Sequence, residues 1–244
     1  MAKKILVCVL SAIMLLSFSG CGSELKDSMF FNVDFSTETV NDNAGQVARS
    51  TSGQEVTFEK DEEIGRVVGV FKETAAVNYL IDYSKMADAF TMEAYVKVAK
   101  QTAYGLICGT YFFNSKTGVG FGTGIFDLGD GDPVGSRKTL SMFTGHGKIS
   151  ETVNGGEPDV WQHLVFVHDG AKDYYYVEGA DVTDGGVDSA GTTMQHDPNA
   201  GFRIGGYNTL GQFCVEDMRV AYVRLYEKAV SAEEVKTLYE GRNS

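Results

Sequence analysis

The sequence predicts an all-β domain, and three observations support this expectation. Glycine is abundant, with 29 residues against 3 prolines. Phe, Tyr, Val and Thr recur in short runs between clusters of Gly, Asp and Asn, which is the pattern of strands joined by tight turns. Only one segment, at the C-terminal end, has a convincing helical pattern. The 43% hydrophobic and 22% charged residues are typical of a folded chain, which excludes a disordered one.

The first 20 residues have the features of an export signal. Lys3 and Lys4 provide a basic start, and residues 5–16 contain a single polar side chain. This apolar stretch is too short to cross a bilayer as a stable helix, which favours a signal peptide over a membrane span.

The end of this segment, Ser19-Gly20-Cys21, resembles a bacterial lipobox, although Phe18 stands where an aliphatic residue is usual. The resemblance implies cleavage before Cys21 and lipidation of that cysteine, which would anchor the protein in the bacterial cell envelope, facing the periplasm or the exterior. An ordinary secretory signal with a chance cysteine is the alternative. The expected organisation is a signal peptide over 1–20, a short tether over 21–29 and one domain over 30–244.

The net charge of the mature chain limits the classes of molecule that it is expected to bind. Lys3 and Lys4 are the only charged residues before position 21, which leaves 19 basic against 33 acidic residues and a formal net charge of −14. A nucleic-acid-binding protein needs clustered Lys and Arg to neutralise phosphates, and the sequence has no such cluster. Attachment to anionic lipid by charge is excluded for the same reason, so the lipid on Cys21 is the expected membrane contact.

Strands are expected from alternation and from turn residues. In residues 90–98, every second side chain is apolar, which indicates a half-buried strand, and the run 164–167 is apolar on both sides, which indicates a central strand. Asp169-Gly170 supplies a turn into the Tyr-rich segment 174–177 and predicts a hairpin. The expected strands are 30–35, 54–58, 64–71, 76–81, 90–99, 104–113, 118–127, 138–144, 147–153, 161–168, 173–178, 201–206 and 213–227.

The single predicted helix begins after Ser231. Ser231 and Glu234 have the spacing of a capping box, and Val230 and Val235 can form the accompanying hydrophobic staple. Gly241 is suited to terminate the helix.

Cys108 and Cys214 are the two cysteines left in the folded domain once Cys8 leaves with the signal and Cys21 is acylated. An exported pair could form a disulfide. Both nevertheless lie in apolar runs, where free cysteine behaves as a small core residue. The sequence leaves both states open.

Five motifs in order resemble the laminin-G-like domains of the concanavalin A-like lectin/glucanase superfamily, over about residues 30–240. This resemblance implies a two-sheet antiparallel jelly-roll sandwich with a short C-terminal helix. Two departures are Tyr95, where Trp is usual, and Ala221, where many relatives carry Asp. The motifs are Asn41–Gly45, Phe90–Val96, Asp159–Gly170 with Tyr176–Gly179, Phe202–Gly206 and Val223–Val235.

The resemblance also implies a structural calcium ion in some relatives, held by acidic groups of the edge loops. Asp42 and Asn43, with Asn41, are the candidate ligands here, although Ala221 puts the site in doubt. A second acidic loop is better explained by turn chemistry, because it lacks a complete set of calcium ligands; it contains Asp127, Asp130 and Asp132.

Aromatic residues are the candidate ligand-binding groups. Tyr104, Tyr111 and Phe113, with Phe112, flank glycine-rich strands and could present rings on a concave face, although alternation turns some of them inward. Trp161 is the only tryptophan, and its place at the start of an apolar strand favours a core position over sugar stacking.

Catalytic signals are weak. Glycan-hydrolysing members of the superfamily carry an E-x-D-x-E strand, and Glu59, Asp61 and Glu63 match these letters, but further charged residues between them favour a solvated turn. His163 and His168 fall on opposite faces of one strand and cannot share a site. The expected function is therefore a non-catalytic binding module at the cell surface, with a glycan as ligand; the alternatives are a protein-binding adhesion module and a glycoside hydrolase of the same fold.

Overall fold

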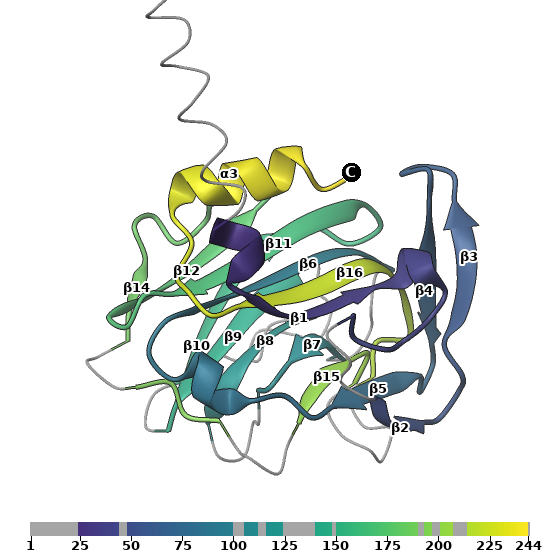
Figure 1. Ribbon diagram of the computed structural model, residues 1–244, viewed down its shortest axis with the longest axis horizontal. Helices are drawn as coiled ribbons and strands as arrows, with labels where there is room; N and C mark the ends of the chain where they lie inside the picture. The colour runs from purple at the N-terminus through teal and green to yellow at the C-terminus, as the bar shows by residue number, and fades with distance from the viewer. Residues whose placement is uncertain are drawn as a thin grey trace, which may run out of the picture.

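Two antiparallel sheets pack face to face and enclose the main hydrophobic core (Figure 1). The computed structural model describes residues 24–43, 48–99, 105–111, 116–123, 140–147, 150–189, 193–196, 201–206 and 214–243. This arrangement confirms the expected all-β jelly-roll sandwich.

Sheet A has nine strands among the described residues, in the order β13-β12-β11-β6-β16-β4-β3, with β1 also paired to β16 and β14 to β12. Its long central strand β16 pairs with β4 through its first half and with β1 through its second half. The strands are β1 Met29–Asp34, β3 Thr57–Asp61, β4 Arg66–Lys72, β6 Phe90–Val98, β11 Trp161–His168, β12 Lys172–Val177, β13 Ala180–Asp181, β14 Val187–Asp188 and β16 Asp217–Tyr226.

Sheet B has seven strands in the described parts of the chain, in the order β10-β9-β8-β7-β15-β5-β2. Short 3-10 turns, η1 Phe35–Thr37 and η2 Tyr83–Met86, lie in the connections. The strands are β2 Ala48–Ser52, β5 Ala76–Tyr79, β7 Gly105–Gly109, β8 Thr117–Thr123, β9 Leu140–His146, β10 Ser150–Gly156 and β15 Phe202–Ile204.

Strand alternation places apolar side chains of β6 and β11 in the core. Met92 and Leu164 point between the sheets, so Glu93 and His163 point to the outer face of sheet A. The central position of β11, between β6 and β12, is as predicted. The expected half-burial of β6 is wrong, because Glu93 is 0% and Tyr95 is 3% exposed. Aromatic side chains of neighbouring strands cover this outer face as well.

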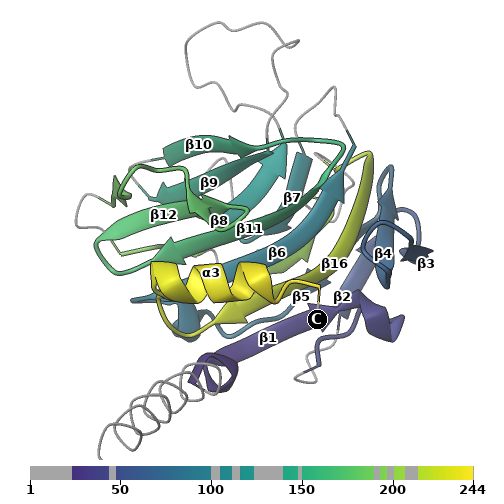
Figure 2. The same ribbon diagram turned by 90° about the horizontal axis from the view of Figure 1, so that it is seen from above.

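Helix α3, Ala232–Glu240, confirms the predicted capping box. The Ser231 hydroxyl accepts a hydrogen bond from the Glu234 amide at 3.3 Å, and the Glu234 carboxylate accepts one from the Ser231 amide at 2.7 Å. The helix lies across the outer face of sheet A, over β11 (Figure 2). There Val235 packs in an outer hydrophobic cluster with Leu25, Val165, Val167, Tyr176, Tyr226 and Val230.

Several strand boundaries differ from the expectation. Strand β2 is mostly polar and strands β13 and β14 have only two residues each, so none of the three carries a hydrophobic alternation that could reveal it. Strands β9 and β10 begin and end later than expected. Their limits are set by their pairing with each other, in which Leu140 lies opposite Gly156 at one end and Gly145 lies opposite Ser150 at the other, and not by the run of apolar residues.

Candidate functional site

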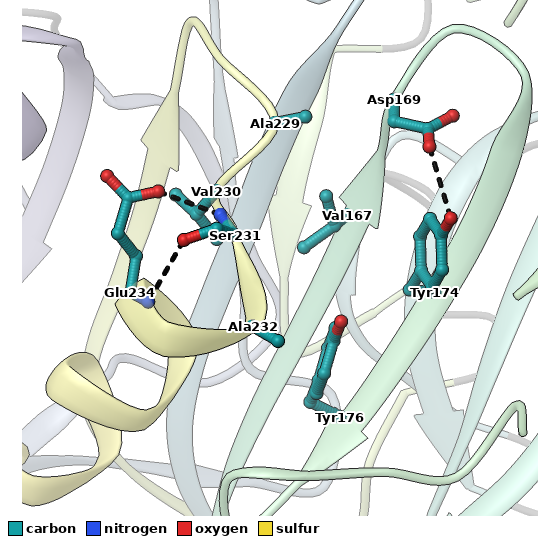
Figure 3. Close-up of a pocket in the computed structure, with 9 residues that line it drawn as sticks. All are labelled: Val167, Asp169, Tyr174, Tyr176, Ala229, Val230, Ser231, Ala232 and Glu234. Carbon is teal, nitrogen blue, oxygen red and sulfur yellow. Dashed lines mark hydrogen bonds between the residues drawn. The ribbon is translucent and has the colours of Figure 1, made fainter. Parts of the chain in front are cut away.

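A cavity of about 390 Å³ lies on the outer face of sheet A, between strands β11 and β12 and the start of helix α3 (Figure 3). This volume is at the lower end of the range of ligand pockets, which is about 300–1,000 Å³. The lining residues are Val167, Asp169, Tyr174, Tyr176, Ala229, Val230, Ser231, Ala232 and Glu234.

Two tyrosines of β12 form one wall of this cavity. The ring centroids of Tyr174 and Tyr176 are 6.4 Å apart and their planes differ by 25°. Tyr175, between them, is fully buried in the core between the sheets. In the sequence, these three tyrosines indicate only a strand. Period-2 alternation indicates that Tyr174 and Tyr176 share a face, but it does not say which face carries a cavity.

Asp169 lies in the turn of the predicted β11–β12 hairpin, at the rim of the cavity. Its Oδ1 accepts hydrogen bonds from the amides of Ala171 at 2.8 Å and Lys172 at 2.7 Å, and its Oδ2 accepts one from the Tyr174 hydroxyl at 3.2 Å. Partial burial raises the pKa of Asp169, but these hydrogen bonds lower it further, so the pKa lies below its usual value. The carboxylate is therefore ionised at neutral pH.

The helix side of the cavity carries a second carboxylate, Glu234. Its Oε1 is 2.7 Å from Nζ of Lys228, and its Oε2 accepts the hydrogen bond from the Ser231 amide that closes the capping box. Glu234 is thus paired with a cation and its side chain is only 11% exposed, whereas Asp169 is exposed and is held by neutral donors, so Asp169 is the better acceptor for a ligand.

A buried polar cluster lies elsewhere on the same outer face, around Glu93. Its Oε1 is 2.9 Å from His163 Nε2 and accepts a hydrogen bond from the Tyr222 hydroxyl at 3.1 Å. Its Oε2 accepts one from the Tyr226 hydroxyl at 2.6 Å and lies 3.6 Å from Arg224. Burial raises the pKa of Glu93, but these partners lower it to about 2. With no exposed surface, Glu93 is placed to stabilise the fold rather than to contact a ligand.

A second polar cluster links the two sheets through Asp173 of β12. Its Oδ2 is 2.7 Å from Nε2 of His146 in sheet B, and its Oδ1 is 2.7 Å from Nδ1 of His168 in sheet A. Burial raises the pKa of Asp173, but the two histidines lower it below its usual value. His168 thus faces the core while His163 faces outward, as predicted. In the described parts of the chain, no group of His, Cys, Asp and Glu is arranged to hold a metal ion.

The predicted aromatic ligand site falls only partly within the described residues. Tyr104 and Phe113, with Phe112, lie outside them. Tyr111 packs on Phe143 with ring centroids 5.7 Å apart, in a cluster with Leu106 separate from the main core. Tyr111 is only 3% exposed, so a ligand would reach its ring only after neighbouring groups move. Its binding role stays a prediction.

Asp42 joins its loop to strand β1. Its Oδ1 accepts a hydrogen bond from the Asn32 amide at 2.7 Å, and the Asn43 amide donates to the Asn32 carbonyl at 2.8 Å. Asp42 is 4% exposed. One buried carboxylate engaged by the backbone does not by itself fit a calcium ion, which takes six to eight oxygen ligands. Calcium binding by Asp42 and Asn43 stays a prediction, and Asp127, Asp130 and Asp132 lie outside the described residues.

Trp161 is buried, as expected, but on the outer face of sheet A and not between the sheets. It is 7% exposed, lies 5.0 Å from the Tyr95 ring and belongs to a small cluster with Tyr222 and Ala221. Cys108 and Cys214 are both free thiols, Cys108 in the core and Cys214 partly exposed, so the structure has the free-thiol alternative.

The residues that match E-x-D-x-E occupy the end of β3 and the following turn, so Glu59 and Asp61 are in a strand and only Glu63 is in the turn that was expected. Glu59 pairs with Arg219 at 2.7 Å and Glu63 with Lys97 at 2.5 Å. Asp61 accepts hydrogen bonds from two turn amides and from Trp161 Nε1. These carboxylates thus stabilise a hairpin and its neighbours.

Cys21 lies outside the described residues. Within the described part, no helix is both long and apolar enough to cross a membrane. Leu25 is 7% exposed and packs in the outer hydrophobic cluster beside helix α3, so the chain is docked on the domain four residues after Cys21.

Comparison with solved structures supports the same fold. The binding domain of botulinum neurotoxin DC, solved in complex with rat synaptotagmin II, superposes with a TM-score of 0.66 at 11% identity, covering 89% of this chain and 52% of that chain. The chain thus spans about half the length of that domain. Domain 4 of AbnA, an extracellular arabinanase from Geobacillus stearothermophilus solved with arabinotriose, superposes with a TM-score of 0.63 at 13% identity, covering 87% of this chain and 98% of that chain.

Comparison of sequences identifies the family. No curated protein sequence matches the chain significantly. The family model described as the concanavalin A-like lectin/glucanases superfamily matches residues 73–236, which is most of the folded domain and four of the five motifs. The early loop with Asp42 precedes the matched segment. With this match and the jelly-roll sandwich together, the chain belongs to the concanavalin A-like lectin/glucanase superfamily.

Proposed function

We propose that the domain is a non-catalytic carbohydrate-binding module and that the cavity between β12 and α3 holds the sugar. The observation that carries the proposal is the pair of nearly parallel rings, Tyr174 and Tyr176, on one wall of a 390 Å³ cavity with the carboxylate of Asp169 at its rim.

The chemistry of this cavity suits a sugar. A pyranose has faces of C–H groups that pack on aromatic rings and a periphery of hydroxyls that require hydrogen-bond partners. Tyr174 and Tyr176 supply the rings, and Val167, opposite Tyr174 on the neighbouring strand β11, adds an apolar side chain. Asp169 accepts three hydrogen bonds from the protein, and a carboxylate has about four acceptor sites, so one remains for a sugar hydroxyl. Such charge-assisted hydrogen bonds are about twice as strong as neutral ones.

The structural neighbours support a binding module in general terms. Domain 4 of AbnA was solved with arabinotriose, and a solved structure of botulinum neurotoxin type C concerns its interaction with two ganglioside molecules. Both proteins share only the fold with this chain, at 13% and 11% identity.

The carboxyl groups support binding without catalysis. Glycoside hydrolysis needs one carboxyl kept protonated by a raised pKa beside a second carboxylate. Among the described Asp and Glu residues, each one whose pKa departs from its usual value has it lowered. These groups are ionised at neutral pH and cannot act as the general acid.

A protein ligand is the second candidate, because the botulinum neurotoxin DC domain was solved with synaptotagmin II. The described surface gives it less support. Leu80 and Val160 are the exposed large hydrophobic residues in the described part of the chain, at 48% and 41%, and they flank strands of different sheets, β5 and β11. Protein-binding surfaces usually concentrate their binding energy in a contiguous apolar patch.

We also propose that Cys21 carries a lipid that holds the module at the bacterial cell envelope. Leu25 is docked on the domain and lies four residues after Cys21, a separation that can span at most about 14 Å. The domain would remain close to the membrane surface.

A glycan array probed with the purified domain, followed by titration calorimetry with the best glycan, tests the proposal. Tyr174→Ala should weaken binding about two- to tenfold, since an aromatic contact contributes about 0.5–1.5 kcal/mol beyond its buried area. Tyr174→Phe, which keeps the ring, is the matched control and should retain most of the affinity.

The rival site at Tyr111 is tested in the same assay. Loss of binding in Tyr111→Ala but not in Tyr174→Ala, with unchanged melting temperatures, would move the site to the outer face of sheet B. Absence of any bound glycan would contradict the carbohydrate assignment.

A further inference from the structure

The cavity between β12 and α3 has a one-sided charge. Its nine lining residues include the carboxylates Asp169 and Glu234 and no Lys, Arg or His. Lys228, next to the cavity, is 2.7 Å from Glu234 and its charge is balanced there. The remaining seven residues are uncharged and present two phenol rings, apolar side chains and the Ser231 hydroxyl. A ligand therefore meets a negative rim and an uncharged interior.

The region around the tyrosine wall adds to this negative charge. The pKa of the Tyr174 hydroxyl lies above its usual value. Desolvation is the largest cause, and the negative charges of Asp169, Asp181 and Asp188 raise this pKa further. The Lys172 ammonium donates a hydrogen bond to the Gly185 carbonyl at 3.1 Å. Three carboxylates thus act on the Tyr174 hydroxyl, and one of them, Asp169, contacts it directly.

Asp169 is held rigidly as an anion. Two backbone amides and the Tyr174 hydroxyl fix its carboxylate, and a fixed charge cannot turn away from an approaching ligand. An anionic group brought to the rim would be repelled by a charge that the hairpin keeps in place, whereas a hydroxyl would find a free acceptor.

Resting on the proposed carbohydrate-binding function, we propose that this cavity selects uncharged glycans and rejects glycans that carry carboxylate, sulfate or phosphate groups, with Asp169 as the residue that sets the selectivity. Neutral sugar hydroxyls donate to the Asp169 carboxylate, and the rings of Tyr174 and Tyr176 hold the C–H face of the same sugar.

The test is a glycan array of matched pairs, in which each sialylated glycan stands beside its desialylated parent and galactans stand beside polygalacturonates. We expect neutral members to bind at least about tenfold more tightly than their acidic partners. Preferential binding of acidic members would overturn the selectivity and leave the carbohydrate assignment intact. No binding to any glycan would overturn both.

Asp169→Asn identifies the source of the selectivity. Asparagine keeps an oxygen for the turn amides but removes the charge. We expect the neutral-to-acidic affinity ratio to fall at least about threefold. Asp184→Asn, an equal change of charge at an exposed loop residue outside the cavity, is the matched control and should leave the ratio unchanged.

Salt dependence provides an independent readout. Screening shortens the reach of the repulsion from about 10 Å at 0.1 M salt to about 3 Å at 1 M. The ratio of the affinities for neutral and acidic glycans should fall in high salt for the wild type, and it should change less for Asp169→Asn. An unchanged ratio in Asp169→Asn, with a native melting temperature, would contradict the role of Asp169.

Discussion

His163 Nε2 lies 2.9 Å from Oε1 of Glu93, and both side chains are completely buried on the outer face of sheet A. The two residues come from neighbouring strands, β11 and β6, and two tyrosine hydroxyls and Arg224 complete the surroundings of the carboxylate. An ion in this position is stable only with all its partners, because desolvation of a charge costs several kcal/mol. The geometry thus couples the two central strands of the sheet.

Removal of one partner should strongly destabilise the fold. We expect Glu93→Ala to lower the free energy of unfolding by about 3–5 kcal/mol, since Arg224 loses its buried counter-charge and His163 and the two tyrosine hydroxyls lose their hydrogen-bond partner. Glu63→Ala is the control, because Glu63 forms an exposed ion pair with Lys97 and should contribute at most about 1 kcal/mol. Urea unfolding measures both values, and equal losses would contradict the assigned role of Glu93.

Stability should fall in acid through the same carboxylate. The pKa of Glu93 is about 2 in the folded protein against an ordinary 4.5, so its contribution is complete above about pH 4.5 and is lost as the pH falls towards 2. Asp173, whose pKa is also lowered, acts in the same direction. The urea concentration at the midpoint of unfolding, measured at several pH values, should therefore fall between pH 5 and pH 3. Glu93→Gln should flatten this dependence; an equally steep profile in the variant would assign the titration to other groups.

Asp42 should stabilise the fold whether or not it binds calcium. Asp42→Ala leaves the Asn32 amide without its acceptor, and we expect a loss of about 1–3 kcal/mol in the free energy of unfolding. EDTA separates the two roles. If calcium binds through Asp42 and Asn43, chelation lowers the melting temperature of the wild type but not of Asp42→Ala. A wild-type melting curve that EDTA leaves unchanged would assign Asp42 to the backbone contact alone.

The proposed anchor has a direct test. Cys21→Ala should release the protein from the membrane fraction, because removal of the acyl chains removes about 0.8 kcal/mol per buried CH₂ group. Immunoblots of membrane and soluble fractions measure the effect. Cys214→Ala, at a free thiol of the folded domain, is the control and should stay membrane-bound. Retention of Cys21→Ala to the same extent would contradict lipidation at this residue.

The domain should not hydrolyse glycans. Glu59 and Glu63, which match the spacing of catalytic carboxylates in the superfamily, are exposed and paired with Arg219 and Lys97. Incubation with β-glucan, galactan and host-type glycans should release no new reducing ends. Release that disappears in Glu59→Gln or Glu63→Gln would place the chain among the glucanases of this fold.

Local patterns were sufficient for much of the fold. The capping box of Ser231 and Glu234, the turn at Asp169-Gly170 and the opposite orientations of His163 and His168 all depend on residues close in the chain. Such features follow from local hydrogen bonds and from the two-residue period of a strand, so the sequence by itself determines them. The strongly acidic composition, with no cluster of Lys and Arg, likewise leads to the prediction, made without reference to the fold, that nucleic acid is not a partner.

The candidate site depended on contacts that local patterns do not contain. Alternation places Tyr174 and Tyr176 on one face, but only the docking of helix α3 makes that face a cavity. Glu93 has the pattern of a solvent-facing residue, yet Tyr222 and Tyr226, more than 120 residues away, bury it. The sequence determined which side chains share a face; only the tertiary structure decided which faces are covered, because coverage comes from segments distant in the chain.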